Sequence, residues 1–220
     1  MRLDDVIEFA ENPEPRCPCV LLLDTSGSMR GAPIAALNRG LSAFQTDLNR
    51  DPLAKKRVEV AVVTFNSEVR VVQDFVTANQ FQAPVLKADG MTLTGQGIIT
   101  AISLVRARKT QYKNNGISYY RPWIFMVTDG APAGEPPVNI QEAAERIALE
   151  EEYRRVAFFA VGVEGADMKI LSTLSRRTPL RLKGLQFQEM FLWLSASMQR
   201  VSQSQFGEDT ALPPPGWGMV

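Results

Sequence analysis

The residues Asp24, Ser26 and Ser28, in the segment DTSGS, are the first feature of the sequence that could carry chemistry. One carboxylate and two hydroxyls stand at alternate positions, and Gly27 frees the backbone between the two serines from its usual steric limits. All three side chains can therefore turn towards one point. Three converging oxygens suit a hard cation, so the segment predicts a cation-binding loop.

Two other segments offer further oxygen ligands. Thr92 and Thr94 stand in MTLTG, immediately before a helical pattern, and Asp129 follows the apolar run FMVT. In an open α/β sheet, ligands bind at the carboxyl ends of the strands. If the strand before Asp129 neighbours the strand before Asp24, both carboxylates face the same crevice.

Short buried strands are expected to carry these residues. Four runs are almost continuously apolar, as in a parallel sheet that is covered on both faces. These runs are Val20–Leu23, Val58–Phe65, Trp123–Thr128 and Ala157–Val163. A shorter alternating stretch, Val69–Phe75, follows the second run closely enough to be its antiparallel neighbour.

Helical stripes separate these strands. Apolar residues recur at three- and four-residue steps over Ile34–Leu48, Ile98–Val105 and Phe187–Val201. A further helix is predicted after Asn139, which with Glu142 forms a box-like capping pair. The predicted fold is α/β: a doubly wound, Rossmann-like domain with a mostly parallel sheet, one antiparallel edge strand and helices on both faces.

The domain division expected from these patterns is an N-terminal segment 1–16, one domain over 17–203 and a Pro-rich C-terminal tail over 204–220. Periodicity is lost after Ser202, and the tail contains PPPGW. A frayed tail is favoured over a strap along the domain or a docking segment. The position of Trp217 so near the end nevertheless suggests that something covers it.

Composition narrows the classes of function. Lys plus Arg equals Asp plus Glu, 24 of each, which gives no support for nucleic-acid binding. No apolar run approaches the length of a membrane span. Met1 to Pro15 lacks the basic-then-apolar order of a signal peptide. Cys17 and Cys19 would lie on one face of a strand and are predicted to be free packing thiols, so a reducing cytoplasmic setting is expected.

Histidine is absent from the sequence. Its absence removes the commonest general base and the usual ligand of transition metals. Any metal must be held by oxygen, which favours Mg²⁺, Mn²⁺ or Ca²⁺ over Zn²⁺ or Cu²⁺.

The motifs DTSGS, T-x-T and TDG, in this order, resemble the metal-ion-dependent adhesion site of von Willebrand factor A domains. The similarity runs from about Cys19 to Met198. It implies a divalent cation, Mg²⁺ before Mn²⁺ or Ca²⁺, and a partner protein that donates an Asp or Glu carboxylate to that cation. It favours Thr94 over Thr92 as the threonine ligand. The implied metal ligands are Asp24, Ser26, Ser28, Thr94 and Asp129.

A closer resemblance connects the chain to the TerY-type proteins of bacterial tellurium-resistance and stress operons. It rests on LDTSGSMRG at 23–31, Asn38, Gly40, the pair Asp51-Pro52 and the pair Thr64-Phe65. It implies a scaffold or regulator in a bacterial signalling assembly, with kinase-like or PP2C-type phosphatase proteins as partners.

Two alternatives remain beside this non-enzymatic interpretation. A strand-end aspartate beside Mg²⁺ is also how haloacid dehalogenase-like phosphatases begin, so Asp24 could serve a Mg²⁺-dependent phosphoryl hydrolase. The second acidic residue of such enzymes would stand at Ser26, and no histidine replaces it as a proton shuttle. A structural domain with a vestigial metal site is the other alternative.

Overall fold

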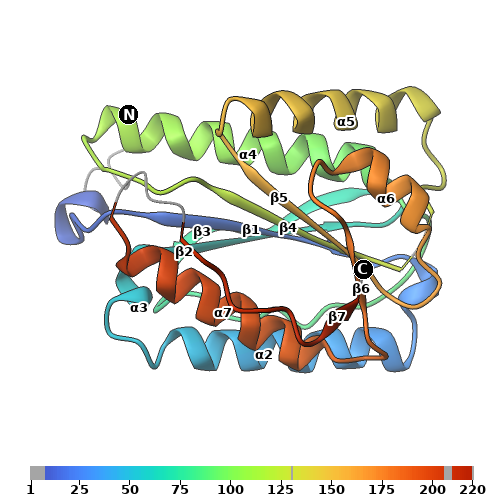
Figure 1. Ribbon diagram of the computed structural model, residues 1–220, viewed down its shortest axis with the longest axis horizontal. Helices are drawn as coiled ribbons and strands as arrows, with labels where there is room; N and C mark the ends of the chain where they lie inside the picture. Colours follow the sequence, from blue (N-terminus) through green and yellow to red (C-terminus); the bar gives the residue numbers. More distant parts are fainter. Residues whose placement is uncertain (1–7, 130, 206–209, 220) are drawn as a thin grey trace.

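A computed structural model describes residues 8–129, 131–205 and 210–219 of the chain. A seven-stranded sheet, in the order β3-β2-β1-β4-β5-β6-β7, forms the middle layer between two layers of helices (Figure 1). The strands are β1 (Cys17–Asp24), β2 (Val58–Phe65), β3 (Val69–Thr77), β4 (Trp123–Thr128), β5 (Ala157–Gly162), β6 (Leu180–Leu182) and β7 (Gly218–Met219). The helices are η1 (Gly27–Met29), α2 (Ala32–Leu48), α3 (Ala54–Arg57), α4 (Thr94–Asn114), α5 (Pro137–Glu152), α6 (Met168–Leu174) and α7 (Phe187–Gln203).

The strand β1 lies at the centre of the sheet, parallel to β2 on one side and to β4 on the other. Its alternate side chains serve two different cores, because successive residues of a strand point to opposite faces. Leu21 and Leu23 belong to the core beneath α2 and α7, whereas Val20 and Leu22 belong to the core beneath α4 and α5. Burial on both faces explains the continuous apolar runs in the sequence.

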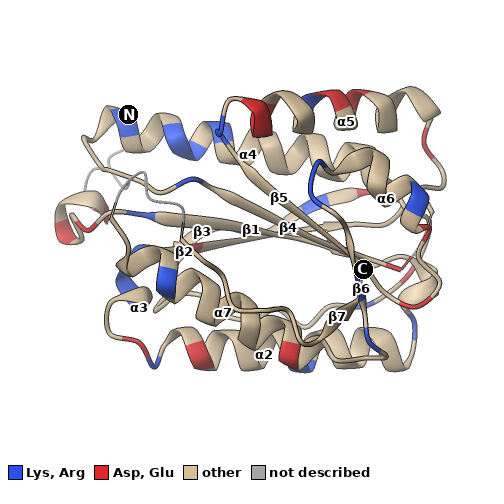
Figure 2. Cartoon of the chain, viewed as in Figure 1, with Lys and Arg blue, Asp and Glu red and all other residues tan. Residues whose placement is uncertain are grey.

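Charged residues are concentrated on the helices and at the ends of the sheet, and the middle of the sheet is almost free of them (Figure 2).

The helices α2 and α7 cover one face, and α4 and α5 cover the other. At Gly40 in α2, an added Cβ would lie 2.6 Å from a ring carbon of Phe191 in α7. The small residue therefore sets how closely these two helices approach.

The parallel register brings the functional segments together. Leu23 in β1 pairs with Val127 in β4, so Asp24 and Thr128, the residues that follow this pair, are the last of their strands. Both strands end at the same edge of the sheet, as the sequence predicts for the segments that carry Asp24 and Asp129. Gly130 of the TDG motif lies outside the described residues.

The outermost strand on each side of the sheet runs antiparallel to its neighbour. The strand β3 pairs with β2, as predicted, and carries two register shifts. The prediction of one antiparallel edge strand was incomplete, because β7 adds a second by pairing with β6. Neither β6 nor β7 has more than three residues, which is too short for a periodic signal.

The C-terminal segment before β7 is a strap over the domain rather than the frayed tail that the sequence favours. Trp217 is buried, and its ring packs edge-on against Trp193 of α7 with centroids 5.5 Å apart. The indole N–H of Trp193 donates to the carbonyl oxygen of Pro213 at 2.7 Å. Residues 206–209 and Val220 of this segment, and residues 1–7 of the N-terminal segment, lie outside the described part.

Two local predictions had different outcomes. Cys17 and Cys19 are buried free thiols, as expected. The expectation that Asn139 caps a helix was wrong, because α5 already begins at Pro137. A proline at the first helical position needs no N–H partner, and Asn139 instead directs its side chain towards Glu135. Over the described residues, no helix combines the length and the apolar character that a bilayer crossing requires.

Candidate metal centre

The loop after β1 is folded around its own aspartate. The backbone N–H of Ser26 donates to Oδ1 of Asp24 at 2.8 Å. The short helix η1 then turns Ser28 back, so that its hydroxyl lies 3.0 Å from the hydroxyl of Ser26. Asp24 and Ser26 are buried and Ser28 is exposed, so the loop opens to solvent at Ser28.

The second carboxylate joins this loop across the sheet. The hydroxyl of Ser28 donates to Oδ1 of Asp129 at 2.8 Å, and the hydroxyl of Thr128 donates to Oδ2 of Asp24 at 2.5 Å. Four of the five predicted ligands therefore belong to one connected set of oxygens, drawn from the carboxyl ends of β1 and β4.

Thr94, the fifth predicted ligand, is the first residue of α4 and is 1% exposed. Its hydroxyl is buried and has no hydrogen-bond partner among the described residues. A buried hydroxyl without a partner is unfavourable and calls for a ligand, a water or an ion. Thr92 differs from it, because its backbone forms an antiparallel bridge with Ala133 and its hydroxyl is not among the buried atoms that lack a partner.

The two carboxylates are costly to keep ionised. Burial raises the pKa of Asp24 to about 6, although hydrogen bonds from Thr128 and Ser26 lower it. Burial also raises the pKa of Asp129, against the hydrogen bond from Ser28. In the part of the chain that the structure describes, no ion pair joins either aspartate to a Lys or Arg. The site therefore holds negative charge that only neutral groups of the chain offset.

A neighbouring loop braces the cation-binding loop. The N–H of Gly27 donates to the carbonyl of Gly90 at 3.0 Å, and the N–H of Asp89 donates to the carbonyl of Thr25 at 2.8 Å. Arg30, just beyond η1, forms an exposed ion pair with Asp89. Sequence reasoning missed Asp89, because nothing in its local pattern reports a contact 59 residues away.

Glu135 is a second residue that the sequence did not reveal. Its carboxylate accepts hydrogen bonds from the backbone N–H groups of Gly95 and Gln96, at 2.7 and 3.1 Å. It thereby satisfies the amino end of α4, directly beside Thr94, in place of a local cap. The absence of a Cβ at Gly95 lets the backbone of Asn139 approach at this point.

The donor set is made of two carboxylates and three hydroxyls. Within the described residues, no group of three or more His, Cys, Asp or Glu side chains is arranged to hold a metal ion. The oxygens of the loop are the donor type that suits a hard cation.

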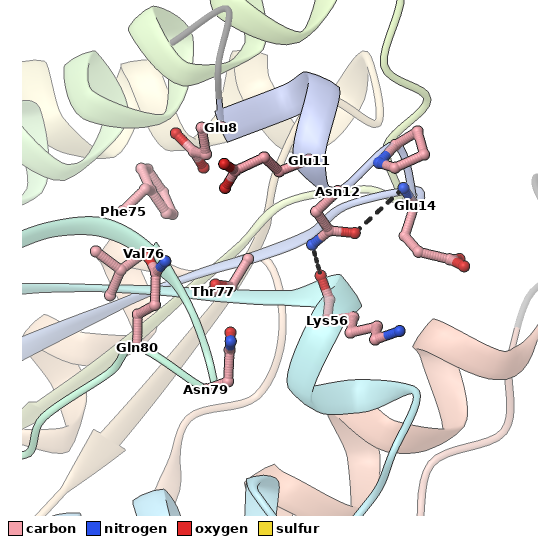
Figure 3. Close-up of a pocket in the computed structure, with 11 residues that line it drawn as sticks. Glu8, Glu11, Asn12, Glu14, Lys56, Phe75, Val76, Thr77, Asn79 and Gln80 are labelled. Carbon is pink, nitrogen blue, oxygen red and sulfur yellow. Dashed lines mark hydrogen bonds between the residues drawn. The ribbon is translucent and has the colours of Figure 1, made fainter. Parts of the chain in front are cut away.

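A separate hollow of about 650 Å³ lies at the opposite end of the sheet (Figure 3). None of the five predicted ligands lines it. Glu8 and Glu11 line it near Phe75, whereas the carboxylate of Glu14, another lining residue, points away and pairs with Arg57 (Figure 3). The chemistry predicted from the sequence is thus located at the carboxyl ends of the strands and not in this hollow.

The sequence model of the von Willebrand factor type A (VWA) domain matches residues 19–183, three-quarters of the chain. The chain belongs to this family. Domains of the family mediate protein interaction and adhesion. A search among curated proteins gave no match for this VWA domain.

Solved structures share the VWA fold with this chain at low sequence identity. A von Willebrand factor type A protein from Catenulispora acidiphila gives a TM-score of 0.65 at 17% identity, over 84% of this chain and 43% of that one. The pilus adhesin SpaC from Lactobacillus rhamnosus GG gives 0.66 at 16% identity, over 86% and 30%. Proximal thread matrix protein 1 from the mussel byssus has a zinc-occupied MIDAS motif (metal-ion-dependent adhesion site). It gives a TM-score of 0.55 at 15% identity, over 84% of this chain and 48% of that one. This VWA domain therefore spans less than half the length of these three proteins.

Proposed function

We propose that this VWA domain is a protein-interaction module that docks a partner through a divalent cation. The cation is Mg²⁺ before Mn²⁺ or Ca²⁺, because the site offers only oxygen ligands and few of them are charged. The residues proposed to hold it are Asp24, Ser26, Ser28, Thr94 and Asp129.

One observation carries this proposal above the others. Two buried carboxylates lie at the carboxyl ends of β1 and β4, and among the described residues no Lys or Arg pairs with either of them. The helix α4 begins beside the carboxyl end of β2, and its first residue, Thr94, has a buried hydroxyl without a partner. Burying two like charges in one crevice is unfavourable unless a positive charge joins them. A divalent cation would neutralise both aspartates and give the hydroxyl of Thr94 a partner.

The exposed position of Ser28 supports docking from outside the chain. Neutral hydroxyls leave a bound cation open to another anionic ligand, and a carboxylate from an Asp or Glu of a partner protein suits that position. The zinc-occupied MIDAS motif of the mussel protein and the pilus adhesin SpaC support the same general mode, since both proteins share the fold.

The proposed setting is a bacterial stress-response or tellurium-resistance assembly in the cytoplasm, with a kinase-like or PP2C-type phosphatase protein as partner. The TerY-type motif set at 23–31 supports it, together with two buried free thiols that suit a reducing compartment. The hydrolase alternative gains no support from the site. At Ser26, where the second acidic group would stand, there is a hydroxyl that contacts Ser28. The other carboxylate of the connected set, Asp129, follows a different strand and accepts a hydrogen bond from Ser28.

A capture experiment tests the proposal. The purified domain is used as bait in a bacterial lysate, as wild type in Mg²⁺ and in EDTA, and as the Asp24→Ala variant in Mg²⁺. Glu68→Ala in Mg²⁺ is the control, because it removes an exposed carboxylate outside the site. We expect a partner that wild type and the control retain in Mg²⁺ and that both EDTA and Asp24→Ala release. Equal capture in all four conditions would place the interface elsewhere.

A further inference from the structure

The hollow of about 650 Å³ at the amino ends of the strands plays no part in the proposed function. It lies between residues 8–14 on one side and the end of β3 with the turn that follows it on the other (Figure 3). Sites for small molecules have volumes of about 300–1,000 Å³, so the hollow is large enough to hold one. The side chains that line it indicate the chemical class of such a ligand.

The side of the hollow formed by residues 8–14 has an excess of negative charge. Glu8 pairs with Arg108 at 2.5 Å. Arg108 and Arg16 also hold the buried Glu59, so that two carboxylates are balanced by two guanidinium groups. Glu11 is a further carboxylate, and it is exposed and forms no hydrogen bond or ion pair with another described residue. Its charge is the one that an added cation would offset.

The other charged groups at the hollow are directed elsewhere. The carboxylate of Glu14 points away and pairs with Arg57. Lys56 contributes its carbonyl oxygen, which accepts a hydrogen bond from Asn12 at 2.8 Å, while its ammonium group points away from the hollow (Figure 3). The hollow itself is therefore acidic, although a lysine stands at its margin.

A nearly buried hydroxyl reaches the same hollow. Thr77, the last residue of β3, lines the hollow and is 5% exposed. Its hydroxyl forms no hydrogen bond among the described residues, and it is not one of the sealed atoms that lack a partner. The oxygen is therefore open to the hollow and calls for a donor from outside. Phe75, two residues earlier on the same face of β3, adds a buried aromatic ring to the wall.

We infer that this hollow binds a primary ammonium group, carried by a small amine or by the lysine side chain of a partner protein. An ammonium group has three N–H donors and no acceptor. The wall offers it acceptors on Glu8, Glu11 and Thr77. The ring of Phe75 suits both the positive charge and an alkyl stem. The inference is independent of the metal centre, which lies at the other end of the sheet.

NMR titration of the isotope-labelled protein with pentylammonium tests the inference, followed at the backbone amides of Thr77 and Gln80. Pentanol is the neutral probe of the same length, and tetramethylammonium is a cation without N–H donors. A lysine with blocked backbone ends presents the ammonium as a protein would. Glu11→Gln and Thr77→Val each remove one proposed acceptor. Glu14→Gln is the matched control, because Glu14 also lines the hollow but its carboxylate points away.

We expect pentylammonium to shift both amides saturably, and pentanol and tetramethylammonium to bind about tenfold more weakly or not at all. Glu11→Gln and Thr77→Val should each raise the Kd of pentylammonium about fivefold. Glu14→Gln should leave it unchanged, and so should Mg²⁺, which keeps the amine from the aspartates of the metal centre. Tighter binding of the blocked lysine than of pentylammonium would assign the ammonium to a partner protein, and the reverse order would assign it to a small amine.

Three results would overturn the inference. The first is the absence of saturable shifts with either amine. The second is equal binding of pentanol, which would make the hollow merely apolar. The third is a loss with Glu14→Gln as large as the loss with Glu11→Gln, which would reduce the effect to the net charge of the protein. None of these results bears on metal binding at Asp24, so the proposed function would stand.

Discussion

At the amino ends of the parallel strands, Glu59 is fully buried and is held by two arginines, whereas at the carboxyl ends Asp24 is equally buried and is held by hydroxyls and one backbone N–H. Arg16 donates to one oxygen of Glu59 at 2.8 Å, and Arg108 donates to both, also at 2.8 Å. The buried carboxylate is therefore paired with cations at one end of the sheet and with neutral donors at the other.

The amino-end network is complete within the chain. Arg108 also pairs with Glu8 at 2.5 Å, so that two carboxylates face two guanidinium groups. Burial by itself would lower the pKa of Arg108, but Glu59 and Glu8 raise it above its ordinary value. Tyr112 adds a short hydrogen bond to Glu59. This network has no need of an outside ion.

At the carboxyl end, no Lys or Arg of the described residues pairs with Asp24 or Asp129. Its two aspartates have raised pKa values, and the buried hydroxyl of Thr94 has no partner among the described residues. A buried carboxylate therefore marks a ligand site only where the chain leaves its charge uncompensated.

The largest effect is expected at the amino end. Glu59→Gln leaves Arg16 and Arg108 buried without their shared carboxylate, and should lower the free energy of unfolding by about 3–5 kcal/mol. Urea denaturation with and without Mg²⁺ measures this, and the loss should be the same in both. Glu14→Gln, which removes a partly exposed ion pair with Arg57, is the control and should cost about 1 kcal/mol or less. A loss for Glu59→Gln no larger than the control would contradict the compensated network.

At the carboxyl end, Asp24→Asn should act in the opposite direction on the metal-free protein. The pKa of Asp24 is about 6 in the fold and lower in the unfolded chain, so the ionised group destabilises the fold at neutral pH. Removing its charge should raise the free energy of unfolding by about 1–2 kcal/mol in EDTA. The rise in Tm that Mg²⁺ gives wild type should disappear in the variant. A variant that is less stable in EDTA and still responds to Mg²⁺ would refute the uncompensated site.

Lowering the pH should change the stability of the metal-free protein and its affinity for Mg²⁺ in opposite directions. As pH falls from 7 through about 6, the folded protein takes up a proton at Asp24 before the unfolded chain does, so the metal-free protein gains stability. The same proton competes with Mg²⁺, so the apparent affinity should fall about tenfold per pH unit below that value. Thermal unfolding across this range, in Mg²⁺ and in EDTA, measures both trends. An Mg²⁺ affinity independent of pH would exclude Asp24 as a ligand.

The smallest effect distinguishes the two threonines. Thr94→Val should weaken Mg²⁺ binding about tenfold, near 1.4 kcal/mol, and should leave the metal-free stability unchanged or slightly higher, because a buried hydroxyl without a partner is removed. Calorimetric titration with Mg²⁺ measures the affinity. Thr92→Val is the matched control and should bind Mg²⁺ like wild type. The reverse result would assign the ligand to Thr92.

The core strands and the long helices could be predicted from local patterns, and the proposed ligands were named from the same patterns and motifs. Continuous apolar runs such as Trp123–Thr128 coincide with strands because burial on both faces leaves no polar position in the pattern. Asp24 and Asp129 could be placed together from the sequence because parallel strands end at one edge. The extent of α2 and α7 likewise follows from a local period.

The surroundings of these elements depend on contacts between distant parts of the chain. The pairing of Arg30 with Asp89, the capping of α4 by Glu135 and the strap that carries Trp217 all join residues far apart in the chain. The strands β6 and β7 are too short to show a period of their own. Local patterns report which face of a segment is buried, but the compensation of a charge depends on which distant groups the fold brings within reach. That is why the sequence indicated where the carboxylates lie, while the structure alone distinguished the compensated Glu59 from the uncompensated Asp24.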